Sequence, residues 1–191
     1  MPLRQAKNVG DAPAIALRDE DDARRAAGLL EQAEITGRTV TINRPREELY
    51  AFWRDVSNLP RFMENLKSVT LLDQRRSHWV VAAPAGQEVE WDSVITEDQP
   101  GRLIAWESAE GADIRNSGRI EFRDGAPGRG TEVSVTMAYD PPAGAIGKLF
   151  PKIFQKEPKI QARRELRRFK QLMETGEISS AKPPHAAPRA K

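Results

Sequence analysis

The chain has 191 residues, of which 39% are hydrophobic and 30% charged, as expected for one globular domain with tails. It has no cysteine, which excludes disulfides, thiolate metal sites and cysteine nucleophiles, and its net charge of +2 is too small to indicate DNA binding. No apolar run is long enough for a transmembrane span or for the core of a signal peptide, so we expect a cytoplasmic protein.

Residues 1–38 mix both charge signs and contain one helical candidate, Asp19–Ile35. Four acidic residues crowd the start of this candidate helix, which suits the positive end of a helix dipole. Chain ends are often loosely held unless they dock on the domain. We therefore interpret residues 1–38 as an N-terminal arm outside the main domain.

The main domain is predicted to open with a strand and two helices. Thr39–Asn43 is a β-branched run typical of a strand. Residues 44–58 then place apolar side chains at helical spacing, with Pro45 in the first turn. Pro60 interrupts this helix, and Arg61–Leu66 is long enough for a second short helix.

Six short segments follow, separated by turn residues, and several of them alternate apolar with polar side chains. Such alternation is typical of strands with one buried face. Because the connections are short, we expect segments adjacent in sequence to pair as an antiparallel meander. The predicted strands are residues 68–73, 77–84, 87–98, 101–110, 116–124 and 129–140.

Pro142–Gly176 is the longest helix-compatible stretch of the chain. Pro151 interrupts its first part, whereas Pro158 suits a first helical turn and Gly176 a C-terminal cap. A long amphipathic helix after many strands needs an apolar surface to pack on. We therefore expect a curved sheet that holds this helix, with a candidate site between the two. Residues 177–191 are rich in Pro, Ala and Lys, which predicts a disordered tail.

The order of these elements and several short motifs resemble the SRPBCC, or START-like, superfamily. Within that superfamily the chain is similar to the polyketide cyclase/dehydrase and coenzyme Q-binding branch, over about residues 39–176. The resemblance implies an α+β helix-grip fold, in which a curved antiparallel sheet wraps a long C-terminal helix around a deep cavity. It also implies binding of a hydrophobic small molecule or lipid, with catalysis in only some members. The motifs are Trp53–Val56, Leu59–Met63, His78–Val81, Val89–Asp92, Ile104–Trp106, Asn116–Gly118, Gly130–Val133 and Leu166–Lys170.

Aromatic side chains on the predicted strands are the candidate ligand contacts. Trp91 and Ser93 lie two residues apart, so they share one face of a strand. Trp106 and Ser108 repeat this pairing of an indole with a hydroxyl, the composition of a mainly apolar pocket. The alternative for each aromatic residue is ordinary core packing. The predicted lining is Trp91, Ser93, Trp106, Ser108, Phe122, Met137 and Tyr139 from the sheet, with Ile146, Phe150, Ile153 and Phe154 from the terminal segment as a candidate lid.

No catalytic residue, cofactor or metal site is predicted. His78 is expected on the solvent side of its strand because its neighbour Trp79 is expected inside, and His185 falls in the tail. Glu90 and Asp92 share a strand face and could be an acid and base pair, but simple alternation makes that face the solvated one. The enzyme alternative, a polyketide cyclase or dehydratase, requires a titratable group that points into the cavity.

A run of arginines on the terminal helix suggests a third class of function. Residues three and four apart share a helix face, so Arg163, Arg164, Arg167 and Arg168 form a positive stripe. Its simplest interpretation is the solvated face of an amphipathic helix. The alternatives are weak contact with an anionic lipid surface, or an RNA- or ribosome-associated role like that of some START-like relatives. Our hypothesis from sequence is hydrophobic ligand binding without catalysis.

Overall fold

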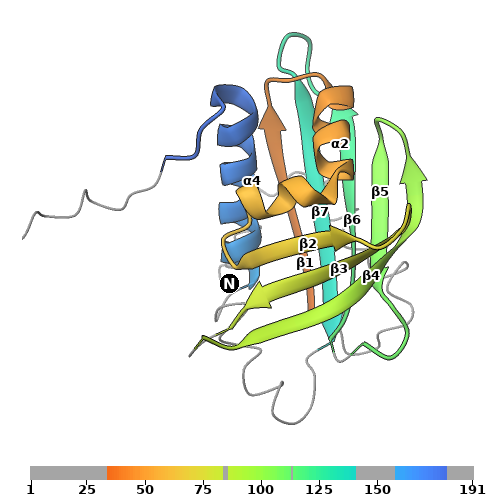
Figure 1. Cartoon of the computed structure of the whole chain (residues 1–191). Helices are drawn as coiled ribbons and strands as arrows, with labels where there is room; N and C mark the ends of the chain where they lie inside the picture. Colours follow the sequence, from red (N-terminus) through yellow and green to blue (C-terminus); the bar gives the residue numbers. More distant parts are fainter. Residues whose placement is uncertain (1–33, 84–85, 113, 141–157, 180–191) are drawn as a thin grey trace, which may run out of the picture.

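The computed structural model describes residues 34–83, 86–112, 114–140 and 158–179 (Figure 1). A seven-stranded antiparallel sheet curls around the last helix, α4 (Pro158–Thr175), as the helix-grip prediction requires. The other helices are α2 (Arg46–Arg54) and the short 3₁₀ helix η1 (Val56–Arg61). The strands are β1 (Glu34–Ile42), β2 (Leu66–Leu71), β3 (Arg76–Ala82), β4 (Glu88–Gln99), β5 (Leu103–Ser108), β6 (Arg115–Asp124) and β7 (Thr131–Asp140).

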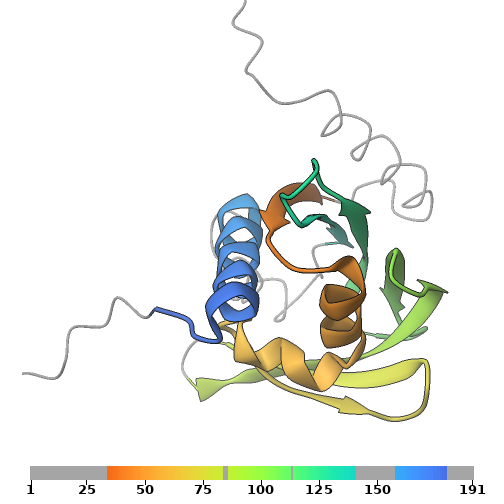
Figure 2. The same ribbon diagram turned by 90° about the horizontal axis from the view of Figure 1, so that it is seen from above.

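The strand order in the sheet is β1-β7-β6-β5-β4-β3-β2. Strands β2 to β7 form the expected meander, each pairing with the next, and β1 returns to pair with β7. The sheet is a half-barrel that stays open between β1 and β2. Seen from above, α4 lies in that opening, between β1 on one side and η1 with β2 on the other (Figure 2).

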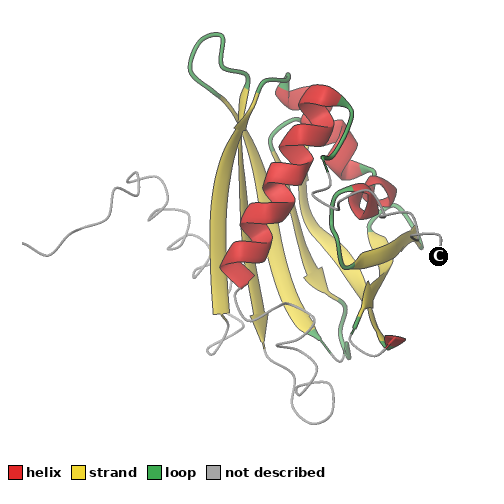
Figure 3. Ribbon diagram, turned by 90° about the vertical axis from the view of Figure 1, so that its left-hand side faces the viewer, coloured by secondary structure: helices red, strands yellow, loops and turns green. Residues whose placement is uncertain are grey.

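The helices are joined to one another by an aromatic cluster. Trp53 of α2, Phe62 at the end of η1 and Phe169 of α4 are all buried, and their ring centroids lie 5.0 to 5.3 Å apart. Leu166 and Leu172 flank Phe169 at a spacing of three residues and are also buried, so one stripe of α4 faces the core. Figure 3 shows α4 running across the sheet with α2 and η1 beside its upper half.

Two boundaries near the start of the domain differ from the prediction. Strand β1 begins at Glu34, not Thr39, because nine residues of this segment pair in register with β7. The predicted helix Asp19–Ile35 therefore cannot include Glu34 and Ile35, and its remainder lies outside the described residues. Helix α2 begins at Arg46, and Pro45 is its N-cap, not a residue of its first turn.

The second short helix is η1, five residues before the predicted Arg61–Leu66. Its start is fixed by Asp55, whose carboxylate accepts a hydrogen bond from the backbone N–H of Ser57 at 3.2 Å. Pro60 lies inside this helix and does not precede it. A 3₁₀ turn tolerates this proline because few of its N–H groups are needed for hydrogen bonds in so short a helix.

The two ends of α4 agree with the prediction. Pro158 is its first residue, and Gly176 follows its last with φ of 80° and a backbone hydrogen bond to the carbonyl of Leu172 at 2.9 Å. The earlier part of the predicted segment, residues 142–157, lies outside the described residues, as do residues 180–191 of the predicted tail. Among the helices described, none combines the length and apolar character needed to cross a membrane.

Candidate ligand-binding site

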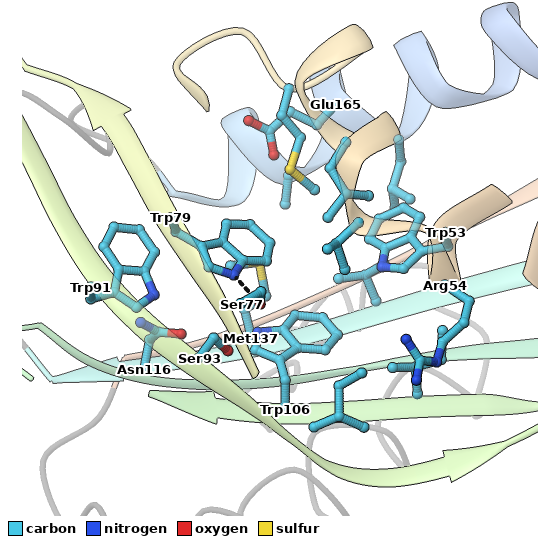
Figure 4. A pocket seen from close by; sticks show the side chains of 18 residues that line it. Trp53, Arg54, Ser77, Trp79, Trp91, Ser93, Trp106, Asn116, Met137 and Glu165 are labelled. Atoms are coloured by element: carbon cyan, nitrogen blue, oxygen red, sulfur yellow. Dashed lines mark hydrogen bonds between the residues drawn. The ribbon is translucent and has the colours of Figure 1, made fainter. Parts of the chain in front are cut away.

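A cavity of about 90 Å³ lies between the concave face of the sheet and the helices (Figure 4). All four tryptophans of the chain line it. Trp53 comes from α2, and Trp79, Trp91 and Trp106 come from the adjacent strands β3, β4 and β5. The four indoles therefore come from four different elements and share this wall with smaller aliphatic and polar side chains.

Strand register explains why the indoles gather. Trp79 is directly opposite Trp91 in the β3–β4 ladder, and their rings lie nearly parallel, with centroids 6.1 Å apart and 13° between planes. Residues directly opposite one another in a ladder point to the same face. Trp106 is opposite Ile95 of β4, two pairs further along from Ser93, so it reaches the same face.

A row of hydroxyl groups crosses the same concave face beside the indoles. Ser77 is opposite Ser93, and Ser93 is opposite Ser108. The Ser77 hydroxyl accepts a hydrogen bond from the indole N–H of Trp79 at 2.9 Å, and the Ser93 hydroxyl donates to the carbonyl of Glu107 at 3.1 Å. The Ser108 hydroxyl accepts from the backbone N–H of Asn116, also at 3.1 Å. Each of the three hydroxyls therefore already makes a hydrogen bond within the protein.

Asn116 supplies the polar group that is not used in this way. It lines the cavity from β6, and its side-chain nitrogen Nδ2 is buried without a hydrogen-bond partner in the part of the chain that the structure describes. A buried donor left unpaired costs about 1 to 3 kcal/mol. A ligand with a hydrogen-bond acceptor near Asn116 would remove that cost.

Two charged residues also line the cavity. The Arg54 guanidinium donates to Asp98 Oδ2 at 2.7 Å and to the carbonyl of Gln74 at 2.8 Å, so it is turned to the rim. Asp98 also accepts from the Tyr50 hydroxyl, and burial together with this bond raises the pKa of Tyr50 to about 12. Glu165 of α4 lies on the wall opposite the sheet (Figure 4).

Sequence reasoning missed Arg54, Asn116 and Glu165 as cavity residues. For Glu165 a signal was present, because it lies three and four residues from Ala162 and Phe169 and so shares the inward stripe of α4. Asn116 also shares a strand face with Gly118 and Ile120. Arg54 has no comparable signal, since it lies at the helix end where spacing no longer fixes direction.

The predicted lining residues fall into three groups. Trp91, Ser93, Trp106 and Met137 lie on the cavity wall. Ser108 lies beside it as the acceptor for Asn116. Phe122 lies elsewhere: it is 2% exposed and packs edge-on against Tyr50 of α2, with ring centroids 6.0 Å apart, because α2 covers this end of the sheet. The side chains of Tyr139, Ile146, Phe150, Ile153 and Phe154 lie outside the described residues.

The outer face of the sheet carries the titratable groups that the sequence singled out. His78 lies opposite Asp92, with its Nδ1 2.8 Å from a carboxylate oxygen, and its Nε2 is 3.3 Å from Glu90. The hydrogen bond to Asp92, with that to Glu90, raises the pKa of His78 against a smaller effect of burial. Alternation correctly placed these three on the face away from Trp79. Among the described residues no cluster of acidic residues and histidines could hold a metal.

Three of the four arginines of α4, Arg163, Arg164 and Arg167, are exposed. Arg164 and Arg168 approach the Glu64 carboxylate at 3.8 and 4.0 Å, which is weak, long-range pairing at the surface. Arg163 and Arg167 are exposed and border a shallow groove together with Arg38 of β1. Arg163, Arg164 and Arg167 therefore face solvent, whereas Arg168 is partly buried, and none of the four lines the cavity.

The fold and the cavity define a helix-grip protein with a mainly apolar internal site. The chain belongs to the family described as polyketide cyclase/dehydrase and lipid transport, whose model matches residues 42–167, about two thirds of the chain. That match confirms the resemblance drawn from the motifs.

Several solved structures are similar to this chain. A protein of Deinococcus radiodurans is 42% identical, and the alignment covers 75% of this chain and all of that one, with a TM-score of 0.61. The Zhui aromatase/cyclase from a Streptomyces species is 15% identical, over 78% of this chain and 100% of its own, with a TM-score of 0.57. A START superfamily protein of Mycobacterium smegmatis is 15% identical, over 69% and 97%, with a TM-score of 0.50. The last two share the fold alone.

Proposed function

We propose that the protein binds a hydrophobic small molecule or lipid in the cavity and releases it unchanged. The observation that supports this most strongly is the wall of four tryptophans, every one the chain contains, around a single internal space. Indoles offer large apolar area with one polar N–H each, which suits a ligand that is mostly apolar. Burial of apolar ligand surface would contribute roughly 25 cal/mol per Å² before association costs are subtracted.

The tryptophan wall also provides the test. Since all four indoles line the cavity, an occupant must change the intrinsic fluorescence of the protein. Native mass spectrometry of protein purified from its own host, followed by organic extraction, would identify a bound compound. Titration of that compound into delipidated protein should then quench or shift the fluorescence with saturation at one equivalent. Protein that arrives empty and binds none of a panel of lipids and quinones would contradict the proposal.

An enzyme of the cyclase or dehydratase kind is the second candidate. It is favoured by Glu165, a carboxylic acid on the cavity wall, and by the named activity of aromatase/cyclase neighbours such as Zhui. A carboxyl group in a mainly apolar site can act as a general acid or base. The discriminating variant is Glu165→Gln, which keeps the shape and removes the titration. Turnover of the extracted compound that is lost in Glu165→Gln, with binding retained, would establish catalysis.

Contact of the arginines of α4 with an anionic surface is a separate and weaker proposal. It is supported by the exposure of Arg163 and Arg167 beside Arg38. RNA is the less suitable partner, because the exposed large hydrophobic side chains in the described residues are Leu71 and Leu72, neither of them aromatic. Binding to anionic lipid vesicles should fall steeply as salt rises, and binding that is insensitive to salt would exclude this role.

A further inference from the structure

One glycine, Gly118, lies in a row of paired residues whose other members line the cavity. Pairing across the sheet places Ile95 opposite Trp106, Trp106 opposite Gly118, and Gly118 opposite Met137, so these residues form one row across β4, β5, β6 and β7. The other three members of the row line the cavity through their side chains. Gly118 contributes none.

The indole of Trp106 occupies the space that a side chain at Gly118 would need. A Cβ atom built on Gly118 would lie 2.4 Å from Cζ2, 2.7 Å from Cε2 and 3.1 Å from Cη2 of that ring. Carbon atoms that are not bonded make their best contact at about 3.5 to 4.0 Å, so the first two distances are overlaps. The ring therefore rests directly on the backbone of β6.

No feature of the backbone explains the glycine. Gly118 lies within β6 and is not one of the glycines with positive φ, so its torsion angles are open to any residue. Its backbone is held between β5 and β7 by ladders on both sides. The remaining explanation is steric: without a side chain, Gly118 leaves room for the indole of Trp106.

We propose that Gly118 is a specificity-determining residue that sets the width of the cavity by letting Trp106 lie flat on the sheet. This inference rests on the proposed ligand-binding function. Any side chain at position 118 would lift the indole away from the sheet, and the space on the other side of the ring is the cavity of about 90 Å³. The displaced indole would then take up part of the space that a ligand needs.

The effect should depend on ligand shape. A rigid ligand with fused rings needs the full width between Trp106 and the opposite wall, whereas a single flexible acyl chain can follow a narrower space. Gly118 therefore favours flat, wide ligands over thin ones. Its replacement should change which ligands bind without changing the fold.

The test compares Gly118→Ala with Gly37→Ala in the full chain. Gly37 is a matched control because it also lies in a strand, and a Cβ there would meet only Thr136 Oγ1 at 3.9 Å, an ordinary contact. We expect Gly118→Ala to weaken binding of anilinonaphthalene sulfonate, a fused-ring probe, by about tenfold, the size of a moderate overpacking effect. Binding of parinaric acid, a fatty-acid probe, should weaken less. Gly37→Ala should leave both dissociation constants unchanged.

A second readout does not depend on any ligand. Fluorotryptophan labelling gives one fluorine NMR resonance for each of the four tryptophans, and Trp106→Leu assigns the resonance of Trp106. Gly118→Ala should shift that resonance, and Gly37→Ala should not. In the Trp106→Leu background, Gly118→Ala should have no further effect on probe binding, because the two changes act through one contact.

The outcomes separate this inference from the proposed function. Wild-type protein that binds neither probe counts against ligand binding, while the fluorine resonance still tests the contact of Gly118 with Trp106. An unmoved Trp106 resonance, or an equal loss of binding in the Trp106→Leu background, would overturn the role of Gly118. If Gly118→Ala alone fails to fold, folding of the Gly118→Ala, Trp106→Leu double variant supports the contact, and failure of both refutes it.

Discussion

Among the residues that the structure describes, the buried amide nitrogen of Asn116 on the cavity wall has no hydrogen-bond partner, so it stabilises neither the fold nor the empty site. We predict that Asn116→Leu raises the free energy of unfolding of ligand-free protein by about 1 kcal/mol, because an unpaired donor is replaced by an apolar group. The same change should weaken binding of a ligand that carries a hydrogen-bond acceptor. Denaturant unfolding and ligand titration measure the two effects.

The matched control for Asn116 is Asn58→Leu. The Asn58 amide donates to the carbonyl of Phe52 at 3.1 Å, away from the cavity, so its loss should destabilise the protein and leave binding unchanged. If Asn116→Leu behaves like Asn58→Leu, the Asn116 amide has a structural role and no role in recognition.

His78 gives a prediction about pH. Its hydrogen bond to Asp92 raises its pKa above the ordinary value of 6.5, so the folded protein holds the proton more tightly than the unfolded chain. The resulting stabilisation is complete below pH 6.5 and is lost as pH rises through the higher pKa of the folded state. Wild-type protein should therefore exceed His78→Gln in melting temperature by more at acid pH than at alkaline pH. A difference that does not vary with pH would show that the ion pairs with Asp92 and Glu90 contribute nothing.

At the scale of elements, the tight turn before β7 is held against the junction of β1 and α2. Gly130 has φ of 80°, and a Cβ there would lie 2.2 Å from the carbonyl oxygen of Ile42 and 2.6 Å from Cα of Asn43. Thr131, the next residue, donates from its hydroxyl to the carbonyl of Arg44 at 2.7 Å. The hairpin and the junction thus meet backbone to backbone.

We predict that Gly130→Ala lowers the free energy of unfolding by about 3 kcal/mol, from left-handed strain and from overlap with a backbone that cannot move aside. Gly128→Ala isolates the first cause, since Gly128 has φ of 75° with nothing near a Cβ, and should cost about 1 kcal/mol. Thermal or denaturant unfolding measures both. Equal losses in the two variants would mean that the close approach to Ile42 contributes nothing.

The elements that sequence predicted best were those with a strong periodic signal. Alternation in segments such as Val89–Ile95, together with the turn residues between segments, predicted the six strands of the meander and the face of His78. The start of β1 was missed because Glu34–Arg38 has no alternation, and only pairing with β7 makes it a strand. The position of η1 was missed because one hydrogen bond to Asp55 decides it, and no periodicity records such a bond.

The cavity shows the same limit at the level of side chains. Period-two alternation placed Trp91, Ser93, Trp106 and Met137 on the concave face. It also placed Phe122 there, correctly for the face, but it could not show that α2 covers that end of the strand. The gathering of Trp53 from α2 with three strand tryptophans, and the bare backbone of Gly118 under Trp106, follow from register and docking, which are properties of the assembled sheet.

In the whole molecule, hydrogen bonds join the C-terminal end of α4 to the junction of β1 and α2. Near its C-terminus the Glu174 carboxylate accepts from the backbone N–H of Asn43 at 2.7 Å, and Arg44 donates to the carbonyl of Met173 at 2.8 Å. Lys170 adds a bond to the carbonyl of Thr41 at 2.5 Å. Nearer its start, α4 instead contributes Glu165 and Leu166 to the cavity wall, where the opposing space is open.

The difference between the two halves of α4 predicts which of its amides a bound ligand protects from hydrogen exchange. In hydrogen exchange of the free protein, amides of residues 167–175 should exchange more slowly than those of residues 158–166, because opening the C-terminal end breaks contacts with the β1–α2 junction. A ligand binds only when residues 158–166 are folded against the cavity, so its binding free energy stabilises that state. It should therefore slow exchange mainly in residues 158–166 and raise the melting temperature as its concentration rises. Arg44→Ala should speed exchange in residues 167–175 and leave ligand affinity nearly unchanged. Ligand protection confined to residues 167–175 would place the binding site away from this cavity.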